Sequence, residues 1–164
     1  MSNPVRAIPE GYHTLTPYLT CKSSAEAIDF YKSVFGAKEI MRMAGPDGKI
    51  GHAEIQIGDS KVMLADEFPG MSAAPKPGTM NSSALFLYLE NVDATFNRAV
   101  SAGAKVDMPL ANQFWGDRYG KLTDPFGHQW ALAQHVEDVS PDEMIRRQKE
   151  FAEKMAKSQA AGKS

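Results

Sequence analysis

The chain has 164 residues, 43% of them hydrophobic and 23% charged, which is enough for one ordinary globular core. Its formal net charge of -2 gives no reason to expect nucleic acid or an anionic membrane as a partner. No apolar run is long enough to span a bilayer, and the start of the chain lacks the pattern of a signal peptide, so we expect a cytoplasmic protein. The single cysteine, Cys21, excludes an intrachain disulfide and a multi-cysteine zinc site.

The first predicted elements are an arm, a strand and a helix. Residues 1–11 contain two prolines and a glycine and are expected to form a loose N-terminal arm. The apolar segment 15–21 predicts a strand, and the helical spacing of apolar residues in 24–35 predicts a helix with one buried face. Either Ser23 or Ser24 can accept a hydrogen bond from a free amide of the first helical turn.

A later strand of the first half carries three polar residues at alternating positions. If Ile55 and Ile57 face the helix, then His52, Glu54 and Gln56 share the opposite face. Such a row forms either a solvated sheet face or the polar wall of a cavity. We favour the cavity, because binding clefts combine an apolar lining with a few polar groups.

The chain is an internal duplication. Residues 24–38 return 67 positions later as residues 91–105, and the segment 62–66 recurs as 130–134. Two units of one helix and about four strands therefore account for modules at 12–66 and 82–136, joined by a linker at 67–81 that is rich in proline and glycine. This predicts an α+β fold of two paired βαβββ modules that close around a shared cleft.

The strands of the second half also alternate. In the segment 85–89 the leucines should pack on the helices, while Phe86 and Tyr88 should face the cleft. On the last strand Trp130 should face a helix and His135 the cleft.

Residues 141–164 are expected to form a C-terminal helix and tail outside the duplication. Residues 142–157 are rich in charge and in good helix formers, and Met144, Phe151 and Met155 lie close to one helical face; residues 158–164 are expected to form the tail. This face can pack on the body of the protein or on a second subunit.

Several motifs in order carry a family resemblance: AIDFYKSVFGA at 27–37, GHAEIQIGD at 51–59, WGDRYG at 115–120 and DPFGHQW at 124–130. Together they resemble the vicinal oxygen chelate superfamily, and within it the glyoxalase/bleomycin-resistance-like branch labelled 3-demethylubiquinone methyltransferase-like, or PhnB-like. The resemblance implies paired βαβββ modules, usually in a homodimer, with a small-molecule ligand inside the curved sheets. It does not imply one reaction, because members include metal-dependent isomerases, lyases and dioxygenases as well as metal-free proteins that sequester antibiotics.

The metal enzymes of that superfamily take ligands from the cleft side of the first and last strands of each module. The internal repeat puts these positions at Thr14, Met63, Ala84 and Ala131. Alanine has no donor atom, and a thioether is a poor ligand for a hard divalent ion, so we predict that the usual metal centre is absent and that no cofactor is bound.

A displaced divalent metal site remains an alternative. His52, Glu54 and His135 could supply two imidazoles and a carboxylate to an ion. His52 could instead be a general base held by Glu54, or a cavity histidine without a catalytic role.

Two functional hypotheses follow. The first is a metal-independent small-molecule-binding protein, and the second is a lyase, isomerase or dioxygenase-like enzyme that uses the displaced metal or the His52/Glu54 pair. Arg118, in an expected loop at 115–120, can bind a ligand carboxylate or phosphate, pair with Asp117 or cap the sheet. The predicted ligand-binding residues are Met63, Phe86, Tyr88, Trp115, Arg118 and Gln56.

Overall fold

The computed structural model describes residues 5–76, 78–79 and 81–161. The first module consists of β1 (Tyr18–Cys21), α1 (Ser24–Phe35), β2 (Lys38–Ala44), β3 (Ile50–Ile57) and β4 (Ser60–Asp66). The second module consists of β5 (Leu85–Tyr88), α2 (Val92–Ser101), β6 (Lys105–Asn112), β7 (Asp117–Thr123) and β8 (Gln129–His135). A third helix, α3 (Pro141–Ala161), follows.

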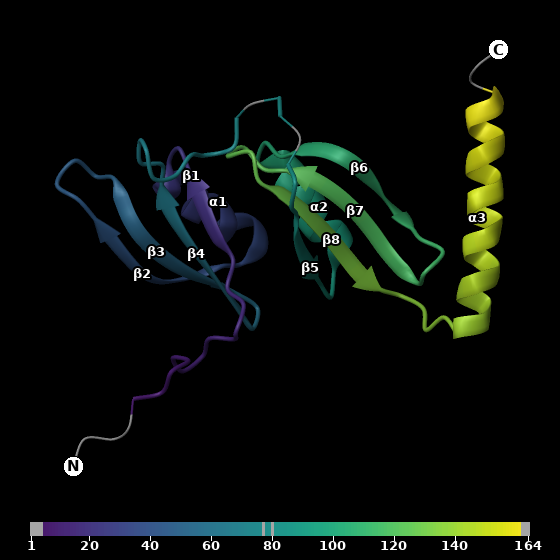
Figure 1. The fold of residues 1–164 in the computed structure, drawn as a ribbon, viewed down its shortest axis with the longest axis horizontal. Helices are drawn as coiled ribbons and strands as arrows, with labels where there is room; N and C mark the ends of the chain where they lie inside the picture. The colour runs from purple at the N-terminus through teal and green to yellow at the C-terminus, as the bar shows by residue number, and fades with distance from the viewer. Residues whose placement is uncertain (1–4, 77, 80, 162–164) are drawn as a thin grey trace.

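The two modules have the same topology. The strand order is β1-β4-β3-β2 in the first sheet and β5-β8-β7-β6 in the second. In each sheet the first and last strands of the module pair in parallel, and the other neighbours are antiparallel. Figure 1 shows the two sheets side by side. The duplication and the α+β fold of paired βαβββ modules are therefore confirmed.

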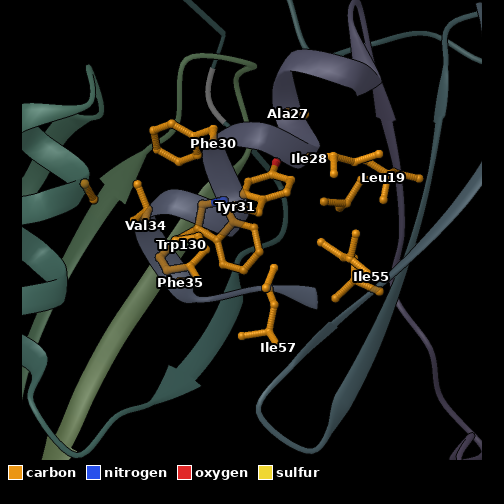
Figure 2. Packing of buried hydrophobic residues seen from close by; sticks show 14 of the residues in the cluster. Leu19, Ala27, Ile28, Phe30, Tyr31, Val34, Phe35, Ile55, Ile57 and Trp130 are labelled. Carbon is orange, nitrogen blue, oxygen red and sulfur yellow. The ribbon is translucent and has the colours of Figure 1, made fainter. Parts of the chain in front are cut away.

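One hydrophobic core joins the modules through their helices. Tyr31 and Phe35 of α1 pack against Trp130 of β8, with ring centroids 5.2 and 4.6 Å from that of Trp130 (Figure 2). The buried Asp124 carboxylate accepts hydrogen bonds from the Tyr31 hydroxyl at 2.7 Å and from the Trp130 indole at 2.8 Å. Since α1 belongs to the first module and β8 to the second, these contacts fix the modules to each other.

The helix-facing residues of the strands agree with the alternation. Ile55 and Ile57 of β3 and Trp130 and Leu132 of β8 are buried in the core, and the leucines of the segment 85–89 pack against it. The opposite faces of both sheets therefore carry the residues that were assigned to a cleft.

The predicted start of the first strand was wrong, and so was the predicted side-chain hydrogen bond of the helix cap, although Ser23 does cap the helix. The strand begins at Tyr18 rather than at Leu15, which is 85% exposed, and Pro17 just before it has no amide for the ladder. Ser23 occupies the N-cap of α1 without a side-chain hydrogen bond. The carboxylate of Asp66 instead accepts from the Ser24 amide at 2.6 Å.

The C-terminal helix exists and extends further than the charge pattern indicated, to Ala161. Figure 1 shows α3 standing apart from both sheets. Of the predicted arm, linker and tail, residues 1–4, 77, 80 and 162–164 lie outside the described part of the chain. Within the part that is described, no helix is both long and apolar enough to cross a membrane.

Candidate functional site

Each sheet keeps one face open. Large side chains stand exposed on these faces: Tyr18 at 53%, Phe86 at 49% and Tyr88 at 65%. The shared cleft predicted within one chain is not closed in this structure, because α1 and α2 pack between the modules and the open faces stay uncovered by the described residues. A cavity of about 490 Å³ lies between the modules, and both Tyr18 and Phe86 border it.

The open face of the first sheet carries a chain of hydrogen bonds that we call the His52 cluster: Tyr12, Glu54, His52 and Tyr18. The Tyr12 hydroxyl donates to Glu54 Oε2. His52 Nε2 lies 3.2 Å from Glu54 Oε1, and His52 Nδ1 lies 3.3 Å from the Tyr18 hydroxyl. The phenol of Tyr12 comes from the irregular segment between the arm and β1, and the other three groups come from β3 and β1.

The pKa values of Glu54 and Tyr12 are shifted within the His52 cluster. The hydrogen bond from Tyr12 lowers the pKa of Glu54 below its ordinary value, and His52 acts in the same direction. Burial, followed by the hydrogen bond to Glu54, raises the pKa of Tyr12 to about 12. Glu54 is thus an ionised acceptor at neutral pH that orients the imidazole of His52, which is the arrangement that a general acid–base pair requires.

The open face of the second sheet carries a second group, the Asp117 cluster: Asp117, Tyr88, Trp115 and His135. Asp117 is buried, and its Oδ2 accepts from the Tyr88 hydroxyl at 3.1 Å and from the Trp115 indole at 3.0 Å. Its Oδ1 lies 2.9 Å from His135 Nδ1. The carboxylate therefore fixes two aromatic side chains and one imidazole in place.

Hydrogen bonds raise the pKa values of Tyr88 and His135 in the Asp117 cluster. The contact with Asp117 raises the pKa of Tyr88. The pKa of His135 is raised first by its hydrogen bond to Asp138, at 3.0 Å, and then by the bond to Asp117.

Around Asp117 the aromatic side chains form a continuous wall. The ring centroids of Phe86 and Tyr88 are 5.0 Å apart, those of Phe86 and Tyr119 are 5.7 Å apart, and those of Trp115 and Tyr119 are 5.6 Å apart. Offset and edge-to-face contacts of this kind hold the rings rigidly. A flat apolar molecule can stack on such a wall, while the polar groups beside it fix the orientation of the molecule.

The comparisons with known proteins agree with this architecture. The model of the Glyoxalase/Bleomycin resistance protein/Dioxygenase superfamily matches residues 12–132. The chain belongs to this superfamily. The resemblance to the vicinal oxygen chelate proteins is thereby confirmed.

Relatives of the chain come from bacteria and plants. It is 44% identical over 134 residues to the uncharacterized protein Rv0887c of Mycobacterium tuberculosis, a match that covers 79% of each chain. The structure of the Arabidopsis thaliana product At5g48480 is 29% identical with a TM-score of 0.58, and the match covers 74% of this chain and 98% of that one. TioX from Micromonospora sp. ML1 is 26% identical with a TM-score of 0.60, again over 74% of this chain and 98% of TioX.

Proteins described as PhnB-like are also among the structural neighbours. A putative 3-demethylubiquinone-9 3-methyltransferase, PhnB protein, from Bacillus cereus has a TM-score of 0.60 at 21% identity, over 74% of this chain and 99% of that one. This likeness supports the fold.

The structure divides the predicted ligand-binding residues of this superfamily member into three groups. Phe86, Tyr88 and Trp115 meet at the Asp117 cluster. Met63 lies on the open face of the first sheet, paired with Tyr18. Gln56 is on the same face, but its amide donates to the Gly58 carbonyl at 2.9 Å.

Arg118 does not lie on an open face. Its guanidinium donates to the two carboxylate oxygens of Asp93 in α2, at 2.7 and 2.5 Å, and to the Asn112 side chain at 3.3 Å. Successive residues of a strand point to opposite faces, so Arg118 must point away from the wall that Asp117 and Tyr119 form. It anchors α2 to the second sheet, and the ligand role considered for it has no support in this geometry.

The resemblance assigned the metal-binding positions to Thr14, Met63, Ala84 and Ala131. Met63 and Ala131 lie on open faces as predicted. The assignment of Thr14 and Ala84 to the first strands was wrong, because these residues precede β1 and β5. Tyr18 and Phe86 are the residues that pair with Met63 and Ala131. A methyl group cannot coordinate an ion. The expectation of no bound cofactor stays a prediction.

The alternative, displaced metal site is not assembled within one chain. His52 and Glu54 contact each other on β3, whereas His135 on β8 contacts Asp117 and Asp138. Among the residues described, no group of three or more His, Cys, Asp or Glu side chains is placed to hold an ion.

Sequence reasoning missed three residues of the two clusters, Asp117, Tyr18 and Tyr12, and Tyr119 of the aromatic wall. Asp117 and Tyr119 could have been found by alternation, because they lie two positions apart on β7, but the segment 115–120 was interpreted as a loop. Tyr18 was not recognised as a residue of the open face, because the first strand was predicted to begin at residue 15. Tyr12 lies just after the arm in an irregular segment, where no periodicity indicates what it contacts.

Proposed function

We propose that this protein binds a planar, apolar small molecule on the aromatic wall of the second sheet, without a metal centre, in the manner of the bleomycin-resistance branch of its superfamily. The observation that carries the proposal is the Asp117 cluster. A buried carboxylate holds Tyr88 and Trp115 at fixed positions beside Phe86 and Tyr119, yet Tyr88 and Phe86 remain half exposed or more. Rigid, exposed aromatic rings are costly to leave in water and are suited to stacking.

We also propose a homodimer. Each chain leaves one open face on each sheet, and a second copy related by a twofold axis could cover the first sheet of one chain with the second sheet of the other. The two faces differ in a complementary way, because Met41, Met43 and Lys61 belong to the first and the aromatic wall with Asp117 to the second. The ligand would then lie between subunits. Cytoplasmic localisation stays a prediction from the sequence.

A second candidate is metal-free acid–base catalysis by the His52 cluster. The observation that favours it is the orientation of His52 by Glu54, with the Tyr18 hydroxyl on the other ring nitrogen. An imidazole held in this way can take a proton from a ligand and pass it on.

The binding proposal is tested with intrinsic fluorescence in buffer containing EDTA. Trp115 is at the site and Trp130 is buried in the core, so quenching by a panel of bicyclic heteroaromatic compounds reports on Trp115. For a compound that quenches, Tyr88→Ala should weaken binding roughly tenfold, since stacking on an aromatic side chain contributes about 1–3 kcal/mol and 1.4 kcal/mol is tenfold.

The control is Val100→Ala, which removes a half-exposed apolar side chain on α2, away from the wall. It should leave the dissociation constant unchanged. Binding that is unaffected by Tyr88→Ala, or that requires added divalent metal, would count against the proposal. Turnover of a bound compound that is lost in His52→Gln would favour the second candidate.

A further inference from the structure

Tyr12 makes contacts with the first sheet that are unusual for a residue in an irregular segment. Residues 5–17, which comprise the described part of the arm and the segment between it and β1, contain no helix or strand, and Val5 and Leu15 are 97% and 85% exposed. Nevertheless the Tyr12 side chain is partly buried against the first sheet, and its hydroxyl donates to Glu54, 42 positions away. Tyr12 is the one residue of 5–15 that is not exposed, so its ring holds this part of the chain against the sheet.

Two charged groups surround this ring in a way that suits a phenol. Lys61 Nζ lies 3.9 Å from the centroid of the Tyr12 ring, which is a cation–π contact on the ring face. At the other end of the side chain, Glu54 accepts a hydrogen bond from the Tyr12 hydroxyl. One group therefore recognises the aromatic face and the other the hydroxyl.

The acceptor would remain in place without Tyr12. His52 is bound to Glu54 Oε1, so the carboxylate is oriented from the side opposite to the phenol. The Glu54 side chain is 15% exposed, and without Tyr12 its Oε2 would be a partly buried acceptor short of a donor. An acceptor in this position gains from any hydroxyl donor that fits.

We propose that Glu54, Lys61 and His52 form a binding subsite for an aryl hydroxyl group, and that Tyr12 occupies this subsite as a tethered internal ligand. A phenolic ligand binds by displacing the segment that carries Tyr12. The inference does not need the aromatic wall, which belongs to the other sheet, but it shares His52 and Glu54 with the second candidate function.

The tether sets how strongly Tyr12 competes. A group linked to its site by a short flexible segment acts at an effective concentration of about millimolar or more. A free phenol must exceed this competition to enter the wild-type protein. Removal of the tethered phenol should therefore increase apparent affinity without any new contact.

The test uses 4-methylphenol as the probe and 4-methylanisole, which lacks the donor proton, as the matched control. Binding is followed by ligand-observed NMR and calorimetry for the wild type, Tyr12→Ala and the double variant Tyr12→Ala/Glu54→Gln. We expect Tyr12→Ala to bind 4-methylphenol at least tenfold more tightly than the wild type. The double variant should lose that gain, and 4-methylanisole should bind to none of the three.

A second variant separates the hydroxyl from the ring. Tyr12→Phe keeps the ring under Lys61 but removes the donor to Glu54, so its affinity for 4-methylphenol should lie between those of the wild type and Tyr12→Ala. Equal binding by the wild type and Tyr12→Ala would show that Tyr12 is only an anchor of the arm and would overturn the proposal. Binding to Tyr12→Ala that survives Glu54→Gln would overturn it as well.

Discussion

Asp117 illustrates how one buried carboxylate can organise a surface. Its two oxygens receive the Tyr88 hydroxyl and the Trp115 indole on one side and face His135 on the other. Burying an ionised carboxylate is costly unless it is fully hydrogen-bonded, so the three partners are needed for Asp117 to sit there at all. The rigidity of the aromatic wall is a consequence of that requirement.

A pH-dependent stability follows from His135. Its pKa is raised by Asp138 and then by Asp117, so its stabilising effect is fully present below the unfolded value of about 6.5 and is lost as the pH rises through the folded value. We expect His135→Gln to be less stable than the wild type at pH 5.5, with a difference that shrinks toward pH 9. Urea unfolding at both pH values measures it.

The control for this prediction removes the larger cause of the shift. In an Asp138→Asn background the difference between His135 and Gln at pH 5.5 should become smaller. A difference that is the same at pH 5.5 and pH 9 would mean that the imidazolium is not stabilised in the folded protein.

At the scale of single elements, alternation along the strands was the most reliable guide. It placed His52 and Glu54 on the open side of β3 and Phe86 and Tyr88 on the open side of β5, because a residue's face is fixed by its parity once the strand is recognised. It failed at Arg118, since β7 was not recognised as a strand from Asp117 onward.

The side-chain contacts between different elements could not be predicted from local sequence patterns. The hydrogen bond between Tyr12 and Glu54 spans 42 positions, and that between Tyr88 and Asp117 spans 29. Which side chains meet across such separations depends on sheet curvature and on where each strand begins. The faces of the candidate site were therefore predictable, but its hydrogen-bonded clusters were not.

The two faces of β5 should respond differently to truncation. Leu87 packs against the core, so Leu87→Ala should lower the free energy of unfolding by about 2–3 kcal/mol, at the low end for a leucine that is only partly buried. Tyr88 is 65% exposed and makes one hydrogen bond to Asp117, so Tyr88→Ala should cost less than about 1.5 kcal/mol.

Chemical denaturation of both variants decides between the two faces. Phe86→Ala serves as a further variant on the open face and should resemble Tyr88→Ala. If Tyr88→Ala destabilised the protein as much as Leu87→Ala, the wall would be packed interior in solution, and the binding proposal would lose its main support.

For the whole molecule, the duplication in the sequence determined the architecture, because each repeat encodes one complete βαβββ module. The way in which the open faces are covered was not encoded in any local pattern. The family match ends at residue 132, before α3 begins. This helix is thus an addition to the shared fold, and its contacts decide whether the fold needs it.

The contacts of α3 with the rest of its own chain are few. Phe151 packs on Phe114 with centroids 5.3 Å apart, and Arg147 pairs with Glu137 at 2.6 Å on the surface. No residue of α3 belongs to the hydrophobic core among the residues described.

We therefore predict that a chain ending at Ser140 folds and still forms the proposed dimer. Loss of one aromatic pair costs about 0.5–1.5 kcal/mol, and each 1 kcal/mol lowers Tm by about 2–4 °C in a protein of this size. The truncated chain should therefore melt within about 6 °C of the full chain, and Phe151→Ala in the full chain should reproduce most of the difference. Light scattering should give the full chain about twice its protomer mass of 17.9 kDa, and the truncated chain about twice its own smaller protomer mass. If truncation instead produced a monomer, or a much larger fall in Tm than Phe151→Ala, then the exposed side of α3, which carries Ile145 and Met155, must pack on the second subunit. In that case the dimer would depend on the added helix more than on the open faces of the two sheets.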